Sequence, residues 1–391
     1  MIDKETRRYR PDRRVIGTFG ALAAAGAISL AAAAFFTPAR AWANLLLASY
    51  YILGLGLAGL LFVAFHYVTG AAWSTAFRRV PEAMAVGVPV AALGVAALLA
   101  FKSPLYPWFG EVVAEGEAMW FKAAWLDPLA FRARAALYFV IWIFFAWLIR
   151  RQSRRQDADG KFSRRRWNAR LSALFLVFFA VTFWLASYDW IMALDPAWYS
   201  TIFGAYNFAG LFQSGLAAII VLAVALRRAG ALRNVLRDEH LHDLGKLLFG
   251  FSCFWMYLWF SQYMLIWYAH LPEETTYFVA RAKGYWAPLF LLQVVLNWAV
   301  PFFFLLPRRA KRSASVLATV AGVVLVGRWL DLYINVMPPF AGETPAFGFA
   351  EVGSAVGVVG LFSLVFLLSF RRASPVPRGD ATLSESLNYR A

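Results

Sequence analysis

Long apolar stretches recur along the chain and are separated by short polar segments. Each stretch has about 20 mostly apolar residues, the length that an α-helix needs to cross the hydrocarbon core of a bilayer. Ten stretches are predicted to be transmembrane helices: 15–36, 45–69, 83–101, 133–149, 171–192, 201–226, 244–269, 285–306, 314–337 and 351–370. The pattern therefore predicts an all-α integral membrane protein of about ten transmembrane helices.

The charge of the connecting segments alternates along the chain. Basic residues gather in 1–14, 70–82, 150–170, 227–243, 307–313 and the C-terminal segment. Acidic residues with few cations occupy 37–44, 102–132, 193–200, 270–284 and 338–350. Because basic loops are retained in the cytoplasm, we expect both termini there. The domains are then a cytoplasmic N-terminus (1–14), a transmembrane domain (15–370) and a disordered cytoplasmic tail (371–391), because this tail contains several Ser and Pro residues.

The first predicted helix has a second interpretation. A basic start, an Ala-rich run and the sequence Ala39-Arg40-Ala41 also resemble a signal peptide with its cleavage site. The apolar run is longer than the apolar part of a typical signal peptide, which favours a retained helix.

The loop 102–132 has two interpretations. Its prolines and tryptophans indicate an ordered segment at the membrane interface. Such a segment is either a docking surface for a partner or part of an aromatic belt that contacts only lipid.

Composition agrees with a membrane protein and limits the cofactors that the chain itself can bind. The chain is 61% hydrophobic and 15% charged with a net charge of +16, and its basic clusters follow the membrane topology rather than a nucleic-acid surface. The single cysteine, Cys253, excludes an intramolecular disulfide and a cysteine-bound iron–sulfur cluster. Of four histidines only His66 lies well inside an apolar run. We therefore expect no haem and no metal bound by this chain itself.

Ionisable side chains inside the predicted helices are few, and each is a candidate functional position because its burial in lipid is costly. Arg328 and Asp331 are three residues apart on one helix face, roughly 20 Å from the basic end of the ninth span. Asp189 lies one turn from the acidic end of the fifth span. Asp195, His270 and Glu273 follow on the same side, and His66 lies toward the other side. The alternative role for each is structural, as an ion pair or a hydrogen bond between helices.

Uncharged polar residues line the later spans. They are either helix contacts or partners for a chain of ordered waters. They are Asn207, Gln213, Ser252, Tyr257, Gln262, Tyr263, Gln293 and Asn297. A run of aromatic residues between Phe254 and Tyr268 would also suit a flat quinone ring.

Three segments resemble one known family. They are 187–206 (SYDWIMALDPAWYSTIFGAY), 259–268 (WFSQYMLIWY) followed by PEET at 272–275, and 327–333 (GRWLDLY) followed by MPP at 337–339. These segments are similar to the ActF-type subunit of alternative complex III, the bacterial quinol:cytochrome c oxidoreductase. This subunit is the smaller of two membrane subunits related to NrfD, the polysulfide reductase type. One departure is Pro196-Ala197-Trp198, where relatives often have Pro-His-Trp.

The resemblance implies a fold of two four-helix bundles, 45–192 and 201–337, with flanking helices 15–36 and 351–370. It also implies a bacterial cytoplasmic (inner) membrane location and a set of partners. These are a larger NrfD-like membrane subunit, a periplasmic iron–sulfur subunit, c-type cytochrome subunits and, in some assemblies, a terminal oxidase. In this family quinol is oxidised in the larger membrane subunit, and the smaller one is proposed to conduct protons.

The hypothesis is therefore a non-haem subunit that provides a proton path for quinol oxidation elsewhere in the assembly. The path would use Asp189, Arg328 and Asp331 as a cluster, Asp195, His270 and Glu273 toward the periplasm, and His66 as the inner relay. Two alternatives stay open, namely direct binding of a quinone such as menaquinone by this chain, and an independent secondary transporter.

Overall fold

The structure, a computed structural model, describes residues 8–100, 105–106, 124–196 and 198–390. Throughout these ranges the chain is helical or irregular and contains no strand. The helices are α1 (Arg13–Phe36), α2 (Pro38–Val68), α3 (Arg79–Met84), α4 (Gly87–Ala100), α6 (Pro128–Asp159), α7 (Phe162–Trp190), α8 (Phe203–Arg228), α9 (Asp238–Ala269), α10 (Pro272–Ala282), α11 (Ala287–Val294), α12 (Val300–Leu305), α13 (Arg308–Arg312), α14 (Ala314–Val336), α15 (Pro338–Ala341), α16 (Phe349–Phe370) and α17 (Leu383–Leu387).

Nine helical stretches in the described part of the chain are long and apolar enough to cross a membrane. They are α1, α2, α3 with α4, α6, α7, α8, α11 with α12, α14 and α16. The protein is therefore a multi-pass helical membrane protein, as the hydrophobic pattern predicted. The predicted interfacial loop falls mostly on 107–123, which lies outside the described residues.

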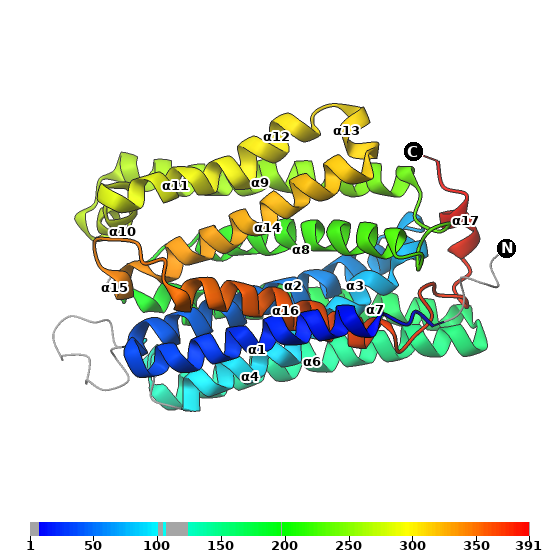
Figure 1. Ribbon diagram of the computed structural model, residues 1–391, viewed down its shortest axis with the longest axis horizontal. Helices are drawn as coiled ribbons and strands as arrows, with labels where there is room; N and C mark the ends of the chain where they lie inside the picture. Colours follow the sequence, from blue (N-terminus) through cyan, green and yellow to red (C-terminus); the bar gives the residue numbers. More distant parts are fainter. Residues whose placement is uncertain (1–7, 101–104, 107–123, 197, 391) are drawn as a thin grey trace.

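Helix α9, which contains the predicted seventh span, is not among these nine. It is 32 residues long and packs against α8, and it runs beside the other long helices in Figure 1. Charged residues occupy its first turns, and Trp and Tyr, whose rings carry a polar group, fill much of the rest. These side chains lower the average hydropathy of a helix that is otherwise of membrane-spanning length.

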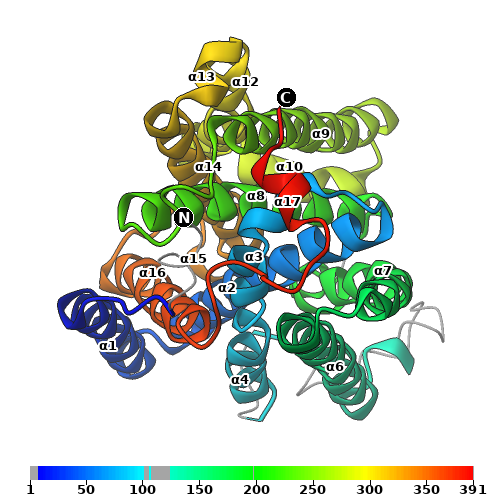
Figure 2. The same cartoon turned by 90° about the vertical axis from the view of Figure 1, so that its right-hand side faces the viewer.

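The long helices run side by side along the longest axis of the molecule (Figure 1). Viewed from the end (Figure 2), α2 and α8 lie in the middle, with α4, α6 and α7 on one side and α9 and α14 on the other. The most apolar part of α2 is entirely buried. Because α2 and α8 pack against each other, they join the two groups of helices into one core.

The first and last long helices pair with each other. Gly26 of α1 and Gly357 of α16 lie so close that a Cβ added to Gly26 would be 2.2 Å from the Cα of Gly357. Small residues allow this approach, which is common where helices pack in membranes. At the end of the pair, Arg40 forms an ion pair with Glu351 at 2.7 Å.

Two ends of the molecule differ in charge. The acidic end carries 193–196, 198–200, 270–284 with α10, and 338–350 with α15. The basic end carries the described residues near both ends of the chain, the α6–α7 connection and α13. At the basic end α6 and α7 extend the predicted spans, so that most of the predicted loop 150–170 is helical, with a tight turn at Gly160 (φ 61°).

The prediction of a disordered tail is wrong for the described residues of the tail. Residues 371–390 cross the basic end, and the buried carboxylate of Asp380 pairs with Arg78 at 2.7 Å and Arg165 at 3.2 Å. Short α17 follows, where the hydroxyl of Ser386 donates to the carbonyl of Trp73 at 2.5 Å. The partners of Asp380 lie more than 200 positions earlier, so the local composition of the tail could not indicate them.

Candidate functional site

The centre of the candidate site is an ion pair buried on α14. Arg328 and Asp331 are 3% and 0% exposed, and Nη1 of Arg328 donates to Oδ2 of Asp331. Nη2 of Arg328 donates to Oδ1 of Asn207 on α8 at 3.2 Å. Gly210 leaves the space for this guanidinium, because a Cβ there would be 2.3 Å from Nη1. The spacing of three residues on one helix face thus produces the pair that the sequence predicted.

The other carboxylate oxygen of Asp331, Oδ1, accepts hydrogen bonds from two more residues. The hydroxyl of Tyr206 on α8 donates to Oδ1. Nδ2 of Asn335, one turn further along α14, donates to the carbonyl of Asp331 at 2.7 Å and to Oδ1 at 3.3 Å. A buried carboxylate needs such partners because an unpaired charge in a low-dielectric interior is very costly.

From Asp331 a hydrogen-bonded chain continues toward the acidic end. The hydroxyl of Tyr277 on α10 donates to Oδ1 of Asn335 at 2.6 Å. The ring of Tyr277 stacks on Trp198 with centroids 3.8 Å apart, and the guanidinium of Arg281 lies 3.4 Å from the same ring centroid. Asp331, Asn335 and Tyr277 are thereby linked in one continuous polar chain.

Arg281, which packs on the ring of Tyr277, lines a pocket on the acidic end. The volume of this pocket is about 660 Å³, and Asp195, Lys283 and Glu343 also line it. Nε of Arg281 donates to the carbonyl of Ile334 at 3.0 Å, which fixes α10 against the end of α14. Burial lowers the pKa of the Arg281 guanidinium, and the proximity of Tyr277 and Asp195 opposes that shift. Asp195 and Arg281 therefore line the same pocket, and Arg281 is the residue that links this pocket to Tyr277.

A cavity of about 10 Å³, room for about one water molecule, adjoins this chain. Tyr206, Tyr277, Gln262, Gln293 and Asn335 are among its lining residues. Oε1 of Gln293 is buried and has no hydrogen-bond partner among the described residues. The cavity thus offers a polar place for a water next to the partners of Asp331.

Toward the basic end, a second polar group follows about two helical turns away. Nε2 of Gln213 on α8 donates to Oγ of Ser252 at 3.0 Å and to the carbonyl of Asn297 at 2.6 Å. Asn297 lies in a π-helical turn, Val295–Ala299, between α11 and α12. Pro301 has no N–H and so cannot bond the carbonyl four residues before it, which is that of Asn297. Gln213 supplies the missing donor.

Asp189 lies in a separate cluster between α6 and α7. Its carboxylate, 1% exposed, accepts from Nη2 of Arg134 at 3.0 Å, Nε1 of Trp125 at 2.9 Å and the hydroxyl of Tyr138 at 2.9 Å. Tyr50 of α2 bonds to Ser187, two residues before Asp189, at 3.1 Å. The structure therefore joins Arg328 with Asp331, and gives Asp189 a different cationic partner.

The remaining predicted residues take varied places. His270 is exposed at the end of α9 with φ 52°. Glu273 belongs to the first turn of α10, and its side chain is not among those that the structure describes. His66 is in the last turn of α2, where Nδ1 bonds to the carbonyl of Phe62 at 2.6 Å and the ring packs on Phe62 and Trp73. About 15 residues of apolar helix, roughly 22 Å, separate His66 from Tyr51, which contacts α14.

Several site residues were not predicted. Arg134 lies inside the predicted fourth span, and Asn335 lies one turn beyond Asp331 in the ninth. Both are therefore polar residues inside a predicted span, and this property could have identified them. Tyr277 and Arg281 belong to a segment predicted as a loop, and only the packing of α10 against α14 brings them to the site.

No group of three or more His, Cys, Asp or Glu residues within the described ranges is arranged to hold a metal ion. In comparisons with known proteins, no family profile matches the chain and no curated protein is significantly similar to it.

Proposed function

We propose that this chain is a non-haem membrane subunit of a quinol-oxidising respiratory complex of the alternative complex III type, and that it provides a proton path. The family assignment comes from the sequence resemblance. The observation that supports the proton path is the hydrogen-bonded group of Asp331, Asn335 and Tyr277 around a cavity large enough for one water. Arg281 lines both this cavity and the pocket that Asp195 also lines.

In the proposed mechanism, Asp331 is the group that takes up and releases the proton. Arg328 stabilises its carboxylate anion, and Asn207 offers Arg328 a second acceptor. A conformational change that moves Arg328 toward Asn207 disfavours the anion, so Asp331 takes up a proton. When the pair forms again, Asp331 passes the proton to the hydroxyl of Tyr206, whose own proton goes to a water in the adjoining cavity that Tyr277 and Arg281 also line. The amide of Asn335 holds Asp331 and Tyr277 in place and does not itself carry the proton.

Access from the basic end is less complete. Gln213 and Ser252 form its first step, and Asp243, which accepts from the hydroxyl of Tyr389 at 2.5 Å, lies at the basic end of α9. Nine residues of α9, about 14 Å, separate Ser252 from Asp243, and the side chains of Leu244 and Leu248 are buried between them. This apolar stretch keeps the basic side closed while the acidic side is connected, as alternating access requires.

The proposal includes topology and partners. With α9 counted as a span, ten spans place both termini in the cytoplasm, and the two groups of helices around α2 and α8 are the two four-helix bundles. A larger NrfD-like subunit, a periplasmic iron–sulfur subunit and c-type cytochrome subunits would carry the redox chemistry, with a terminal oxidase as a further partner.

The first test is purification of the tagged chain in mild detergent, followed by a visible spectrum and mass spectrometry of co-purified proteins. We expect c-type haem and iron–sulfur subunits. A colourless single polypeptide would contradict the assembly.

The second test measures the proton-to-electron stoichiometry of the assembly. Asp331→Asn is expected to lower it. Asp189→Asn tests the other cluster, because it neutralises an acid that is buried to the same degree. An unchanged stoichiometry in both variants would refute the proton path.

Direct quinone binding is the second candidate, and one pocket favours it. An apolar pocket of about 420 Å³ at the acidic end is lined by Trp125, Tyr188, Trp198 and Tyr199, among others, with Asp195 at its side. Aromatic walls of this kind suit a flat ring. Photo-crosslinking with a quinone analogue distinguishes the two proposals, because it labels either this chain or only its larger partner.

A transporter is the third candidate. The π-helical turn and Pro301 interrupt the helix formed by α11 and α12, and broken helices are typical of transporter binding sites. The co-purification experiment also decides this point, because a transporter is expected to purify without haem-bearing partners.

A further inference from the structure

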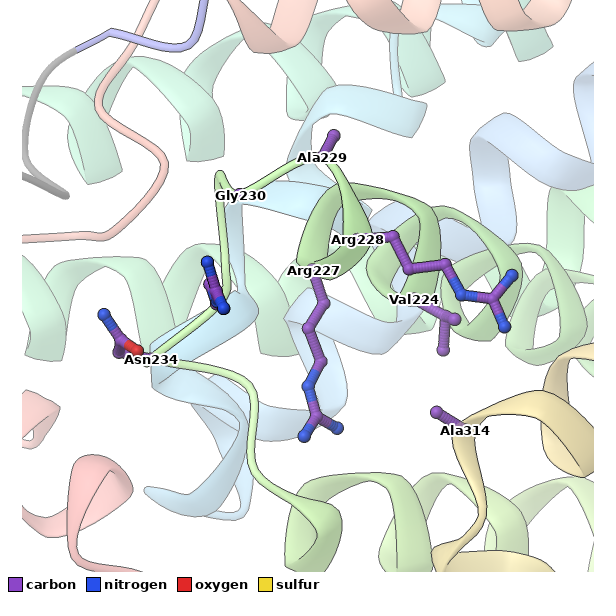
Figure 3. Close-up of a pocket in the computed structure, with 8 residues that line it drawn as sticks. Val224, Arg227, Arg228, Ala229, Gly230, Asn234 and Ala314 are labelled. Carbon is purple, nitrogen blue, oxygen red and sulfur yellow. The ribbon is translucent and has the colours of Figure 1, made fainter.

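A basic pocket lies at the end of α8 on the basic end of the molecule (Figure 3). Its volume is about 800 Å³, and its cationic lining residues are Arg227, Arg228 and Arg233. The chain turns at Gly230 (φ 87°), which brings Asn234 opposite the last turn of α8. Arg233, the residue before Asn234, also lines the pocket. The start of α14, at Ala314, forms another wall.

The pocket has more positive than negative charge. Arg227 forms an ion pair with Asp238 at 2.7 Å. Arg228 and Arg233 are exposed, and neither forms an ion pair with an acid in the described part of the chain. Arg227 and Arg228 also offset the negative end of the helix dipole of α8. Arg233 lies beyond the helix, so this role does not account for it.

The position of the pocket suits the surface of a membrane. The arginines lie at the end of a 26-residue apolar helix, which is the depth of the phospholipid headgroups if α8 spans the bilayer. The lining also includes Val224 of α8, which is buried, and Ala314, the first residue of α14. Val316, further along α14 and outside the lining, is exposed. Arginines at the ends of two apolar helices match a headgroup whose acyl chains lie along those helices.

We propose that this pocket binds the phosphate of an anionic phospholipid in the leaflet on the basic side. The guanidinium groups of Arg228 and Arg233 bind the phosphate oxygens, for which their planar donor geometry is suited. The acyl chains lie along α8 and α14. A soluble phosphate would use the arginines alone and gain nothing from the apolar surfaces of α8 and α14.

The lipid would bridge the two helices that carry the candidate site. Asn207 and Tyr206 lie on α8, and Arg328 and Asp331 lie on α14. A lipid held between the basic ends of these helices therefore fixes their spacing. The binding inference stands on the pocket alone and does not depend on the proposed proton path.

The test is native mass spectrometry of the full chain with its co-purified partners, titrated with phosphatidylglycerol or with neutral phosphatidylcholine. Arg228→Gln/Arg233→Gln is the pocket variant and keeps the Arg227–Asp238 pair. Arg155→Gln/Arg166→Gln is the matched control, because both arginines are exposed at the same end on α6 and α7. We expect preferential binding of phosphatidylglycerol, about 25-fold weaker in the pocket variant and unchanged in the control.

Three outcomes would overturn the proposal. They are equal binding of the two lipids, an equal loss in the pocket and control variants, and displacement of phosphatidylglycerol by inorganic phosphate at millimolar concentration, which would indicate a site for soluble anions. If the double variant is unstable, Arg233→Gln alone, in a loop, is expected to weaken binding roughly fivefold.

Discussion

The hydroxyl groups of Tyr188 and Tyr333 make the same hydrogen bond in the two halves of the molecule. Each donates to the carbonyl 13 residues further along the chain, Thr201 at 2.7 Å and Ala346 at 2.6 Å. Each tyrosine also follows a Trp-Leu pair and precedes a methionine at the same spacing, in WLASYDWIM at 184–192 and WLDLYINVM at 329–337. The ends of α7 and α14 are thus built alike, which supports the two-bundle architecture proposed above.

If these two tyrosines have the same role, removing either hydroxyl lowers the stability of the protein by a similar amount. Tyr188→Phe and Tyr333→Phe are each expected to destabilise the protein by about 1 kcal/mol, the usual net value of one hydrogen bond. Thermal unfolding in detergent measures this. Tyr285→Phe, at a side chain that is 71% exposed, is the control and is expected to change nothing. A loss in only one of the two variants would contradict a shared role.

The buried ion pair on α14 is expected to be strongly coupled. Arg328→Gln leaves the carboxylate of Asp331 buried without its cation, which costs about 3–5 kcal/mol. Arg328→Gln/Asp331→Asn removes both charges and is expected to cost less than the sum of the single changes. Denaturant unfolding of the four proteins gives the coupling energy. The exposed pair Arg227–Asp238 is the control, with a coupling below about 1 kcal/mol.

Gln213 and Pro301 are expected to be coupled through the carbonyl of Asn297. Gln213→Leu leaves this buried carbonyl without a donor and costs about 1–3 kcal/mol. In a Pro301→Ala background the N–H of residue 301 supplies a donor, so the same change is expected to cost about 1 kcal/mol less. Gln262→Leu, whose amide bonds to Ser200 instead, is expected to be additive with Pro301→Ala. Additive behaviour of Gln213→Leu would disprove the explanation.

The attachment of the tail is expected to depend on pH. Burial by itself raises the pKa of the Asp380 carboxyl, but Arg78, the N–H of Thr382 and Arg165 outweigh burial and lower it to about 2. A carboxyl with a lowered pKa stabilises the fold above its unfolded pKa, near 4, and this contribution of about 2 kcal/mol is lost as the pH falls toward 2. The stability difference between wild type and Asp380→Asn should therefore be full at pH 6 and shrink below pH 4.

Glu385→Gln is the control for this prediction, because Glu385 is exposed in the same tail. Its stability difference from wild type is expected to stay small at every pH. If the Asp380→Asn difference also stays constant between pH 6 and pH 3, the ion pairs with Arg78 and Arg165 do not hold the tail.

The hydrophobic pattern predicted most of the membrane helices, because their length and apolar character depend on local sequence alone. Helix α9 shows the limit of that rule, since its Trp and Tyr residues lower its hydropathy without shortening it. The ordered tail shows another limit. Its composition is that of a flexible segment, and the two arginines that hold Asp380 belong to segments that are distant in the chain.

The sequence by itself determined the membrane class, the alternation of charged loops and the pairing of Arg328 with Asp331, because residues three apart on a helix must lie on one face. Only the tertiary structure decided which helices surround each polar group. It placed Asp189 against Arg134 rather than Arg328, and it joined Asn335, a partner of Asp331, to Tyr277 on α10. Contacts between helices depend on how their faces turn toward each other in three dimensions, and local spacing does not encode that rotation.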